Sequence, residues 1–493
     1  MEMTLQEIAA ATGGRILRGD PALAVDGVCT DTREMFDGAL FFALRGPNFD
    51  AHEFLPKARR LGAAAAVVHT ETAHREVAEL PIVRVDDTTR ALGDLARWHR
   101  DRCSATTVIG ITGSNGKTTV KEMLYHILNG VVRSIRTLDN QNNHIGVPLT
   151  LFRMQPQDVY AVVEMGTNST GEIKRLCEIA APDIGLITCI AASHLEGLGS
   201  VEGVAREKAP VLIQTARRGG GFYHADDFWS RRIGKDLKGK VQSFGIDNKA
   251  DVRATGLRSD ADGISFKVIG GRRLSIPILG THNVRNALAA VAVARKLGID
   301  WDTIQRRLNT FRLPDHRMQV RQVGGVTIID DAYNANPASM EAAAETLARM
   351  KCRGRKLFVA GDMLELGEDS IELHRTLGAA LAGFGFDGLF GTGPNTMHVL
   401  AAAGRAGMPE HGLAFQKTRQ DLARILTDLL EPGDTVLFKA SRGMALEKVA
   451  EQVAEELAEG PRKKPERTPA PIRRETQTIR NKHPHSTVGR SVG

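Results

Sequence analysis

The sequence has few cysteines and no long apolar run. Its five cysteines are scattered along 493 residues, and no two of them form a Cys-x-x-Cys pair. An odd number without close spacing supports neither a disulfide framework nor a zinc knuckle, so we expect reduced and mostly buried thiols. No apolar run reaches the roughly 18 to 20 residues that cross a bilayer, and the first residues lack the basic-then-apolar order of a signal peptide. We therefore expect a cytoplasmic protein without a membrane span.

Excess charge is also absent from most of the chain, although the net charge is +7. Residues 461–493 hold nine Lys or Arg and two Glu, which accounts for the whole excess. This stretch is rich in Pro, Thr, Arg and Lys and nearly free of apolar residues, so we predict a disordered basic tail with no specific nucleic-acid partner. Weak binding to a polyanion, or a scaffold function centred on the tail, is the alternative that the charge leaves open.

The length exceeds what one hydrophobic core usually organises and suggests about three domains. Residues 1–85 alternate short apolar runs with turns, which predicts a small α/β domain. Strand and helix patterns alternate through 86–315 and begin again in 316–460, and such alternation produces mostly parallel sheets. The predicted fold class is therefore α/β, with a small N-terminal domain, a central mononucleotide-binding domain and a C-terminal Rossmann-like, doubly wound domain.

A glycine-rich loop occupies residues 110–119, Gly-Ile-Thr-Gly-Ser-Asn-Gly-Lys-Thr-Thr. A β-rich run enters it at 106–109, and helix-forming residues leave it at 120–124. Glycines let the backbone approach phosphate oxygens, the helix N-terminus and Lys117 offset their charge, and a Thr hydroxyl can bind Mg²⁺. The pattern predicts an ATP site, although Ile111 stands where the usual first glycine would be; an ordinary strand-to-helix turn is the alternative. The predicted ATP-binding residues in this loop are Gly113, Ser114, Asn115, Gly116, Lys117, Thr118 and Thr119.

Glu164 ends a predicted strand at 159–164. Ligands bind at the carboxyl edge of doubly wound sheets, and carboxylate oxygens are preferred Mg²⁺ ligands. The position therefore predicts a metal contact, with a capping or solvated carboxylate as the alternative.

Eight blocks of sequence, the phosphate loop among them, together resemble the Mur ligases over about residues 4–458. The other blocks are Asn142–Pro148, Glu164–Asn168, Ser193–Gly197, His282–Ala287, Asp330–Pro337, Gly361–Gly367 and Ser441–Met444. The resemblance is strongest to members that join D-alanyl-D-alanine to UDP-N-acetylmuramoyl-tripeptide, and it implies an ATP-dependent amide ligase of peptidoglycan precursor synthesis. ATP would phosphorylate a carboxylate, an amine would attack the acyl phosphate, and ADP and phosphate would leave. A relative that adds a single amino acid is the alternative.

The resemblance implies a catalytic set of Lys117, Glu164, His194 and Lys208. The last three of these and Thr118 are the implied Mg²⁺ ligands, with Lys208 as a carbamate formed from CO₂. Glu207 before this lysine and Ala209-Pro210 after it depart from the family pattern, so an exposed helical lysine is the alternative.

The resemblance also implies an ATP site shared between two domains. Asn283 and Asn286 would face the adenine, unless they only cap a helix. Arg317 and Asp331 would reach the phosphates and the ribose from the C-terminal domain. Closure of the two domains would then exclude water from the acyl phosphate.

The remaining implied residues would bind the small-molecule substrates. They are Thr30, Asp31, Thr32, Arg33, Asp50 and His52 for the UDP part, Asn142 and Asn143 as further substrate-binding residues, and Asn334, Asn336, Ser441 and Arg442, which would face the incoming dipeptide. Arg442 could bind the carboxylate of the dipeptide. Cys189, His316 and Ala440 are further departures from the family pattern. We expect a monomer, and leave open whether the third residue of the tripeptide is lysine or diaminopimelate.

Overall fold

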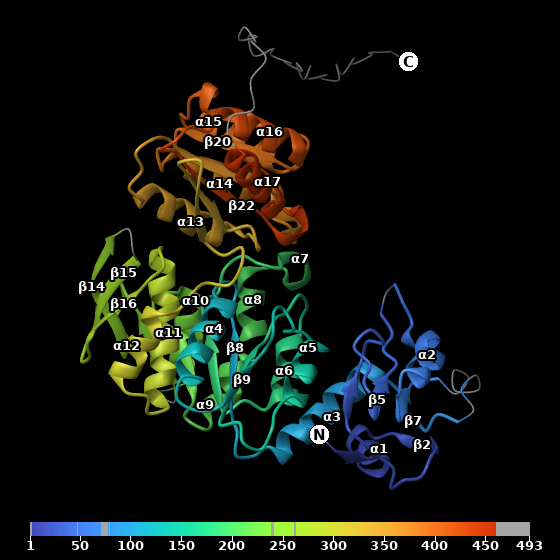
Figure 1. Ribbon diagram of the computed structural model, residues 1–493. Coiled ribbons are helices and arrows are strands. Elements are labelled where there is room, and N and C mark those ends of the chain that lie inside the picture. Colours follow the sequence, from blue (N-terminus) through green and yellow to red (C-terminus); the bar gives the residue numbers. More distant parts are fainter. Residues whose placement is uncertain are drawn as a thin grey trace, which may run out of the picture.

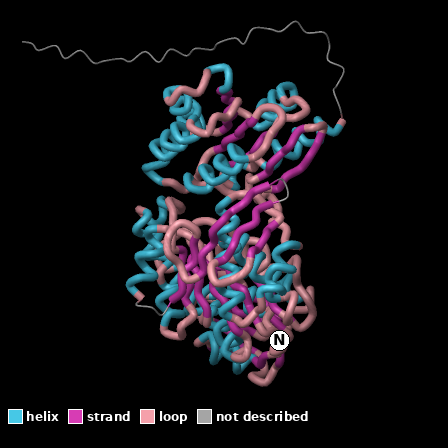
Figure 2. The backbone as a smooth tube through the Cα atoms, turned by 90° about the vertical axis from the view of Figure 1, so that its left-hand side faces the viewer, coloured by secondary structure: helices cyan, strands magenta, loops and turns pink. Residues whose placement is uncertain are grey.

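The computed structural model of the protein describes residues 2–46, 48–70, 77, 79–237, 241–260 and 263–459. The tail predicted at 461–493 lies outside these residues. Within them the chain forms three α/β domains, each built on its own large sheet (Figure 1). Strands run through the interior of these domains and helices cover them, as Figure 2 shows. The predicted α/β class with three domains is confirmed.

The N-terminal domain has a five-stranded sheet in the order β2-β7-β6-β5-β4. Its strands are parallel except for β2, which pairs antiparallel with β7, and a separate antiparallel pair joins β1 to β3. The strands are β1 Met3–Thr4, β2 Arg15–Arg18, β3 Ala24–Val25, β4 Gly27–Cys29, β5 Ala39–Phe42, β6 Ala65–Val68 and β7 Ile82–Arg84. The helices are α1 Leu5–Thr12, η1 Ala51–Phe54, α2 Leu55–Arg60 and α3 Thr88–Arg102, which leads into the central domain.

The central domain has a nine-stranded sheet in the order β16-β15-β14-β13-β12-β11-β8-β10-β9. Its strands are β8 Thr107–Thr112, β9 Ser134–Arg136, β10 Tyr160–Glu164, β11 Ile184–Ile187, β12 Gly221–His224, β13 Val241–Gly245, β14 Val252–Asp260, β15 Gly263–Val268 and β16 Arg273–Ile276. Its helices are α4 Lys117–Leu128, α5 Gly146–Phe152, α6 Glu172–Ala180, α7 Leu195–Leu198, α8 Val201–Lys208, α9 Pro210–Ala216, α10 Phe228–Asp236, α11 Thr281–Lys296 and α12 Trp301–Asn309. Strands β14, β15 and β16 pair antiparallel, an extension that the alternation of strands and helices did not predict.

The C-terminal domain has a six-stranded sheet in the order β17-β18-β22-β19-β20-β21, parallel except for β17. Its strands are β17 Gln319–Val323, β18 Val326–Asp330, β19 Lys356–Gly361, β20 Gly388–Thr392, β21 Leu413–Phe415 and β22 Thr435–Lys439. Its helices are α13 Pro337–Arg349, η3 Gly367–Asp369, α14 Ser370–Ala382, α15 Thr396–Arg405, η4 Glu410–Gly412, α16 Arg419–Leu429, η5 Arg442–Met444 and α17 Glu447–Ala458. The final helix begins at Glu447, after Ala445 has taken a left-handed conformation (φ +47°) at the end of η5.

Strand β8 lies between β10 and β11 in the central sheet, and its pairing brings the candidate site together. Glu164, the last residue of β10, is in register with Ile111, and Ile187 at the end of β11 is in register with Thr112. Because the three strands are parallel, their carboxyl ends meet at one edge. The phosphate loop, Glu164 and the segment after β11 therefore share that edge.

Cys29, Cys103 and Cys177 are buried and Cys189 and Cys352 are half-buried, and all five are free thiols, as predicted. Among the described residues, no helix is both long and apolar enough to span a membrane.

Glu207 explains one departure from the family pattern. Its buried carboxylate accepts hydrogen bonds from the backbone N–H groups of Gly171 and Ile173, at 2.6 and 2.7 Å, and from the Thr167 hydroxyl at 3.3 Å. Gly171 is the N-cap of α6 and offers no side chain of its own. Glu207 supplies the missing cap from α8, where its negative charge also complements the helix dipole.

We predict that Glu207→Ala destabilises the central domain by about 2 kcal/mol, because backbone donors at the start of α6 lose charged acceptors. For a domain of this size the thermal midpoint should fall by roughly 4 to 8 °C. Calorimetry would measure the change, with Glu202→Ala on the exposed side of the same helix as the control. An unchanged midpoint for Glu207→Ala would contradict the capping role.

Candidate active site

The phosphate loop lies at the carboxyl end of β8 and leads directly into α4. Gly113 has φ +152°, and a Cβ atom there would collide with the Thr188 hydroxyl. Gly116 has φ +81°, and a Cβ atom there would collide with the side chain of Asn286. Both positions therefore require glycine, which lets the loop approach the end of β11 and the start of α11.

The loop is also held by the segment that follows β11. Ser114 N–H donates to the Cys189 carbonyl at 2.8 Å, and the Ser193 hydroxyl donates to Ser114 Oγ at 2.9 Å. Cys189 thus contributes its backbone, which any residue could provide. Burial raises the pKa of its thiol, so the sulfur stays protonated.

Lys117 is the first residue of α4, and its Nζ donates to the Gly113 carbonyl at 2.8 Å. This contact folds the ammonium group back over the loop. Burial lowers the pKa of Lys117, while the negative charge of Glu164 opposes the shift. The side chain lies where it could neutralise a bound phosphate.

Glu164 is 2% exposed, and its two carboxylate oxygens differ in their partners. Oε1 accepts hydrogen bonds from Asn142 Nδ2 at 2.8 Å and from Thr118 Oγ1 at 3.3 Å. Oε2 lies 3.5 Å from Lys121 Nζ and makes no hydrogen bond with the described residues. A buried carboxylate oxygen with spare acceptor capacity, beside a Thr hydroxyl, fits a Mg²⁺ ligand set.

Lys121 belongs to the site, although the sequence pattern presented it only as a helix-forming residue. Its side chain is fully buried, and its Nζ lies 3.1 Å from Glu122 Oε1 and donates to the Asp139 carbonyl at 3.2 Å. It also balances the charge of Glu164. Its spacing of four residues from Lys117 places both on one face of α4, and that spacing is the signal that could have revealed it.

Lys208 ends α8 and is 1% exposed, so the alternative of an exposed helical lysine is wrong. Burial, followed by the nearby charge of Lys117, lowers the pKa of Lys208 to about 7. At neutral pH the amine is therefore partly uncharged, and this is the form that reacts with electrophiles such as CO₂.

His194 meets the C-terminal domain. It immediately precedes α7 with φ +53°, and its Nδ1 lies 2.6 Å from Oε2 of Glu365, in the loop after β19. The pair is at ion-pair distance but is not aligned as a hydrogen bond. The contact with His194 lowers the pKa of the Glu365 carboxyl. Because Nδ1 faces Glu365, Nε2 is the ring nitrogen of His194 that can bind a ligand.

Two other side chains of the C-terminal domain reach the phosphate loop. Asn336 and Asn115 exchange a pair of amide hydrogen bonds, each 3.0 Å long. Arg317 Nη2 donates to Thr118 Oγ1 at 3.0 Å, and its guanidinium lies 4.0 Å from the centre of the Tyr333 ring. The structure thus brings Arg317 and Asn336 to the ATP loop from 199 or more residues away in sequence.

Asp331 makes its contacts within the C-terminal domain. Its Oδ2 lies 2.6 Å from Lys439 Nζ, and its Oδ1 accepts from the Met318 N–H at 3.1 Å. Lys439 Nζ also donates to the Asn334 carbonyl at 3.0 Å. The role of Asp331 at the ribose stays a prediction.

Two departures from the family pattern lie in the same region. His316 has φ +57°, a conformation that glycine adopts freely, and its Nδ1 lies 2.7 Å from Asp330 Oδ2. That contact offsets the strain of a non-glycine residue there. Ala440 is buried against Gly361, where a Cβ atom would lie 2.6 Å from Ala440 Cβ.

Asn283 and Asn286 lie in the first two turns of α11. Asn283 Nδ2 donates to the Leu279 carbonyl at 2.7 Å, and Asn286 Nδ2 donates to Asn283 Oδ1 at 3.1 Å. The N-cap of α11 is Gly280, so neither asparagine caps the helix. Asn286 packs against Gly116 and is thereby next to the phosphate loop.

The residues predicted to face the dipeptide differ in exposure. Ser441 is buried, accepting from the Leu364 N–H at 2.9 Å and donating to the Ala335 carbonyl at 3.2 Å. Asn334 is exposed. The Arg442 side chain is 59% exposed, with its guanidinium 5.6 Å from the centre of the Tyr333 ring. Of this group, Arg442 and Asn334 are the side chains accessible to a ligand.

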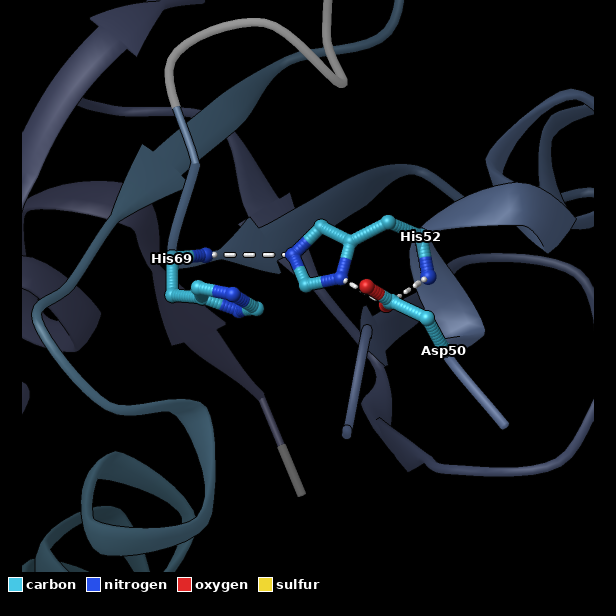
Figure 3. Close-up of side chains that lie close together, drawn as sticks. All are labelled: Asp50, His52 and His69. Carbon is cyan, nitrogen blue, oxygen red and sulfur yellow. Dashed lines mark hydrogen bonds and ion pairs between the residues drawn. The ribbon is translucent and has the colours of Figure 1, made fainter. Parts of the chain in front are cut away.

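Asp50, His52 and His69 form a compact cluster in the N-terminal domain (Figure 3). His52 Nε2 accepts from the His69 N–H at 3.2 Å, so Nδ1 carries the proton towards Asp50 Oδ1, 2.5 Å away. The ligand atoms of the three residues lie within 4.8 Å of one another, close enough to hold a metal ion. However, both ring nitrogens of His52 are already engaged, which makes the cluster a support for its loop.

The other predicted UDP-binding segment is a turn after β4. Arg33 is exposed and its Nη2 lies 2.5 Å from Asp31 Oδ2. Thr30 and Thr32 on either side are half-buried. Contacts of both N-terminal segments with a substrate stay predictions.

Two neighbouring cavities lie where the linker helix α3 meets the central domain. The larger has a volume of about 350 Å³ and the smaller about 260 Å³, and both are lined by His144 and Arg175. The smaller also includes Asn143 and Gly166, just beyond Glu164. Asn143 accepts from the N–H groups of Ile145 and Gly146 and so shapes the start of α5.

Family models match all three domains of the chain. The Mur ligase middle domain matches residues 111–294 and contains the phosphate loop. The model described as "Mur ligase, glutamate ligase domain" matches 316–442, and that described as "Mur ligase family, catalytic domain" matches 24–100.

Similar proteins align over nearly the whole described chain. The UDP-N-acetylmuramoyl-tripeptide–D-alanyl-D-alanine ligase of Escherichia coli is 35% identical, covering 91% of this chain and 98% of its own length. The Bacillus subtilis protein of the same name is 34% identical, covering 92% and 98%.

Solved structures agree with the sequence relatives. MurF from Acinetobacter baumannii superposes with a TM-score of 0.83 at 31% identity, covering 92% of this chain and 99% of that one. MurF from Thermotoga maritima, solved in complex with ADP, gives a TM-score of 0.78 at 28% identity, covering 88% and 98%. By domain content, sequence identity over most of its length and fold, this chain belongs to the Mur ligase family.

Proposed function

We propose that this protein is the ligase that adds D-alanyl-D-alanine to UDP-N-acetylmuramoyl-tripeptide, converting ATP to ADP and phosphate. The observation that carries the proposal is that relatives named for this reaction align with over nine-tenths of the chain at 34 to 35% identity. The site geometry supports it, because a phosphate loop, a buried carboxylate and two buried lysine amines meet at one sheet edge. We expect the enzyme to act as a cytoplasmic monomer on small molecules.

The first chemical step would activate the tripeptide. A carboxylate oxygen attacks the γ-phosphorus of ATP, the bond from that phosphorus to the bridging oxygen breaks, and ADP leaves. Phosphoryl transfer of this kind depends mainly on positioning and electrostatic stabilisation. Lys117 and the N–H groups at the start of α4 would bind the transferred phosphoryl group, and Arg317 would add a second positive charge beside Thr118.

The second step would form the amide. The amino group of the dipeptide attacks the acyl carbon, a tetrahedral species forms, and the C–O bond to phosphate breaks as the nitrogen loses a proton. Arg442, whose side chain is 59% exposed and whose Nη1 lies 3.5 Å from Glu447 Oε1, would bind the dipeptide carboxylate. Asn334 lies exposed in the same domain. Asn336 instead connects this region to Asn115 of the phosphate loop.

The donor set near Glu164 fits Mg²⁺. Glu164 Oε2 is buried and accepts no hydrogen bond within the described part of the chain, and the Thr118 hydroxyl lies beside Oε1 of the same carboxylate. His194 would be a further ligand. A bound Mg²⁺ would offset negative charge on the phosphates.

A carbamate on Lys208 would resolve an electrostatic conflict. In its cationic form the Lys208 amine is buried near Lys117, and both burial and this neighbour disfavour its charge. Reaction of the neutral amine with CO₂ forms an N–C bond and releases a proton, which leaves a carboxylate in place of an ammonium. That anion would attract both Lys117 and a metal ion.

Substrate choice would be tested by incubating the enzyme with ATP, Mg²⁺ and UDP-N-acetylmuramoyl-tripeptide, with tripeptides ending in lysine or diaminopimelate assayed in parallel. We expect phosphate release to depend on D-alanyl-D-alanine and to be absent with single amino acids. Release with a single amino acid but not with the dipeptide would refute the proposed function. Because none of the proposed site residues falls within 460–493, an enzyme ending at residue 459 should keep its turnover. If the protein instead acted as a scaffold through its tail, the same truncation should abolish its function.

The carbamate predicts a specific chemical rescue. Lys208→Ala should reduce turnover by at least about 100-fold, because a charge that stabilises the phosphoryl-transfer step is lost. Added formate or acetate should restore part of it by occupying the vacated space. The matched control is Lys174→Ala, which removes an exposed lysine on α6, and its turnover should equal that of the unmodified enzyme. Full activity of Lys208→Ala without added carboxylate would exclude the carbamate.

A further inference from the structure

The block Gly361–Gly367 is one of the eight sequence blocks that resemble the Mur ligases. It forms the end of β19 and the loop that follows. Asp362 is 1% exposed, and it accepts hydrogen bonds from the Asn395 and Thr396 backbone N–H groups, at 3.1 and 2.8 Å. The loop therefore has a firm base in the C-terminal domain.

The next residues of the loop are fixed as well. Met363 N–H donates to His374 Nε2 at 3.0 Å, and Leu364 N–H donates to Ser441 Oγ at 2.9 Å. Glu365 then turns away with φ +62°. This left-handed conformation is unfavourable for a residue with a side chain, and such strain is often found where a side chain must be aimed.

The Glu365 side chain is aimed at the central domain. Its Oε2 lies 2.6 Å from Nδ1 of His194, which itself has φ +53°. The Glu365 carbonyl accepts from the Glu196 N–H at 3.4 Å, and Gly367 lies against the backbone of Glu196. The contact thus joins α7 of one domain to η3 of the other, with both paired residues in strained backbone conformations.

We propose that Glu365 is a positioning residue for His194, holding the Nδ1–H so that Nε2 is the metal-binding nitrogen, and that the metal site is complete only when the two domains are closed. The inference rests on the proposed function, because it takes His194 as a Mg²⁺ ligand. Histidines that bind metals generally donate their other ring N–H to a carboxylate, which fixes the tautomer and the orientation of the ring.

The interdomain origin of the pair gives it a further consequence. If closure brings Glu365 to His194 and thereby improves metal binding, metal binding must favour closure to the same extent. Glu365 would then link the presence of metal nucleotide to the closed arrangement in which chemistry occurs.

The test uses the full-length enzyme and Mn²⁺ as the probe, with binding followed by electron paramagnetic resonance in the presence of ADP, so that no turnover is needed. We expect Glu365→Ala to weaken Mn²⁺ binding by roughly 10- to 100-fold. Glu365→Gln keeps a hydrogen-bond acceptor, so its Mn²⁺ affinity should fall less than that of Glu365→Ala. Glu368→Gln, an exposed glutamate in η3, should bind Mn²⁺ like the unmodified enzyme.

A double-mutant cycle with His194→Ala separates positioning from a general effect. If Glu365 acts through His194, adding Glu365→Ala to His194→Ala should weaken Mn²⁺ binding no further. Additive losses, or unchanged Mn²⁺ affinity in Glu365→Ala while His194→Ala is impaired, would overturn the inference and leave the proposed function intact.

The role of Glu365 and the proposed ligase function can fail separately. Unchanged Mn²⁺ affinity in His194→Ala would remove His194 from the metal site and overturn this inference with it. Whether the unmodified enzyme releases phosphate with the dipeptide tests the proposed function independently of either variant. In the supporting case, the scattering radius of the enzyme with ADP and Mn²⁺ should decrease on metal addition, and less so in Glu365→Ala.

Discussion

The buried carboxylate of Glu164 is the group on which the site depends. A buried charge must be paired and hydrogen-bonded, or it costs several kcal/mol. Its partners Thr118 and Lys121 come from α4, and Asn142 comes from the loop before α5. Satisfying one carboxylate therefore fixes the phosphate-loop helix, the end of β10 and that loop relative to one another. Oε2 of Glu164 accepts no hydrogen bond from the described residues and therefore keeps its lone pairs for a ligand.

The same edge of the sheet concentrates positive charge. Lys117, Lys121 and Lys208 all lie there, and burial together with the nearby charge of Lys117 lowers the pKa of Lys208. ATP, and a carbamate if one forms, would supply the missing negative charge. The C-terminal domain adds Arg317, which contacts Thr118, and Asn336, whose amide pairs with that of Asn115. Closure of the two domains would place these donors around the reacting groups and would protect an acyl phosphate from water.

The sequence predicted the features that local patterns encode. Strand, loop and helix around residues 106–124, and the place of Glu164 at a strand end, follow from periodicity and glycine spacing. The spacing of four residues from Lys117 could have placed Lys121 on the same face of α4. The burial of Lys121 and the contact of Glu365 with His194 could not be predicted, because both depend on packing between distant segments. Glu207 is a second example. In the sequence it was a departure from the family pattern that favoured an exposed Lys208, whereas in the fold its carboxylate caps α6.

The central chemical claim is that ATP activates a substrate carboxylate at this site. It is tested most directly with tripeptide substrate whose reacting carboxylate carries ¹⁸O, by mass spectrometry of the phosphate released with D-alanyl-D-alanine. An acyl phosphate requires one labelled oxygen to pass from the carboxylate to phosphate, because the C–O bond breaks when the amine attacks. We predict that the released phosphate carries one ¹⁸O atom. Released phosphate without ¹⁸O would contradict activation through an acyl phosphate.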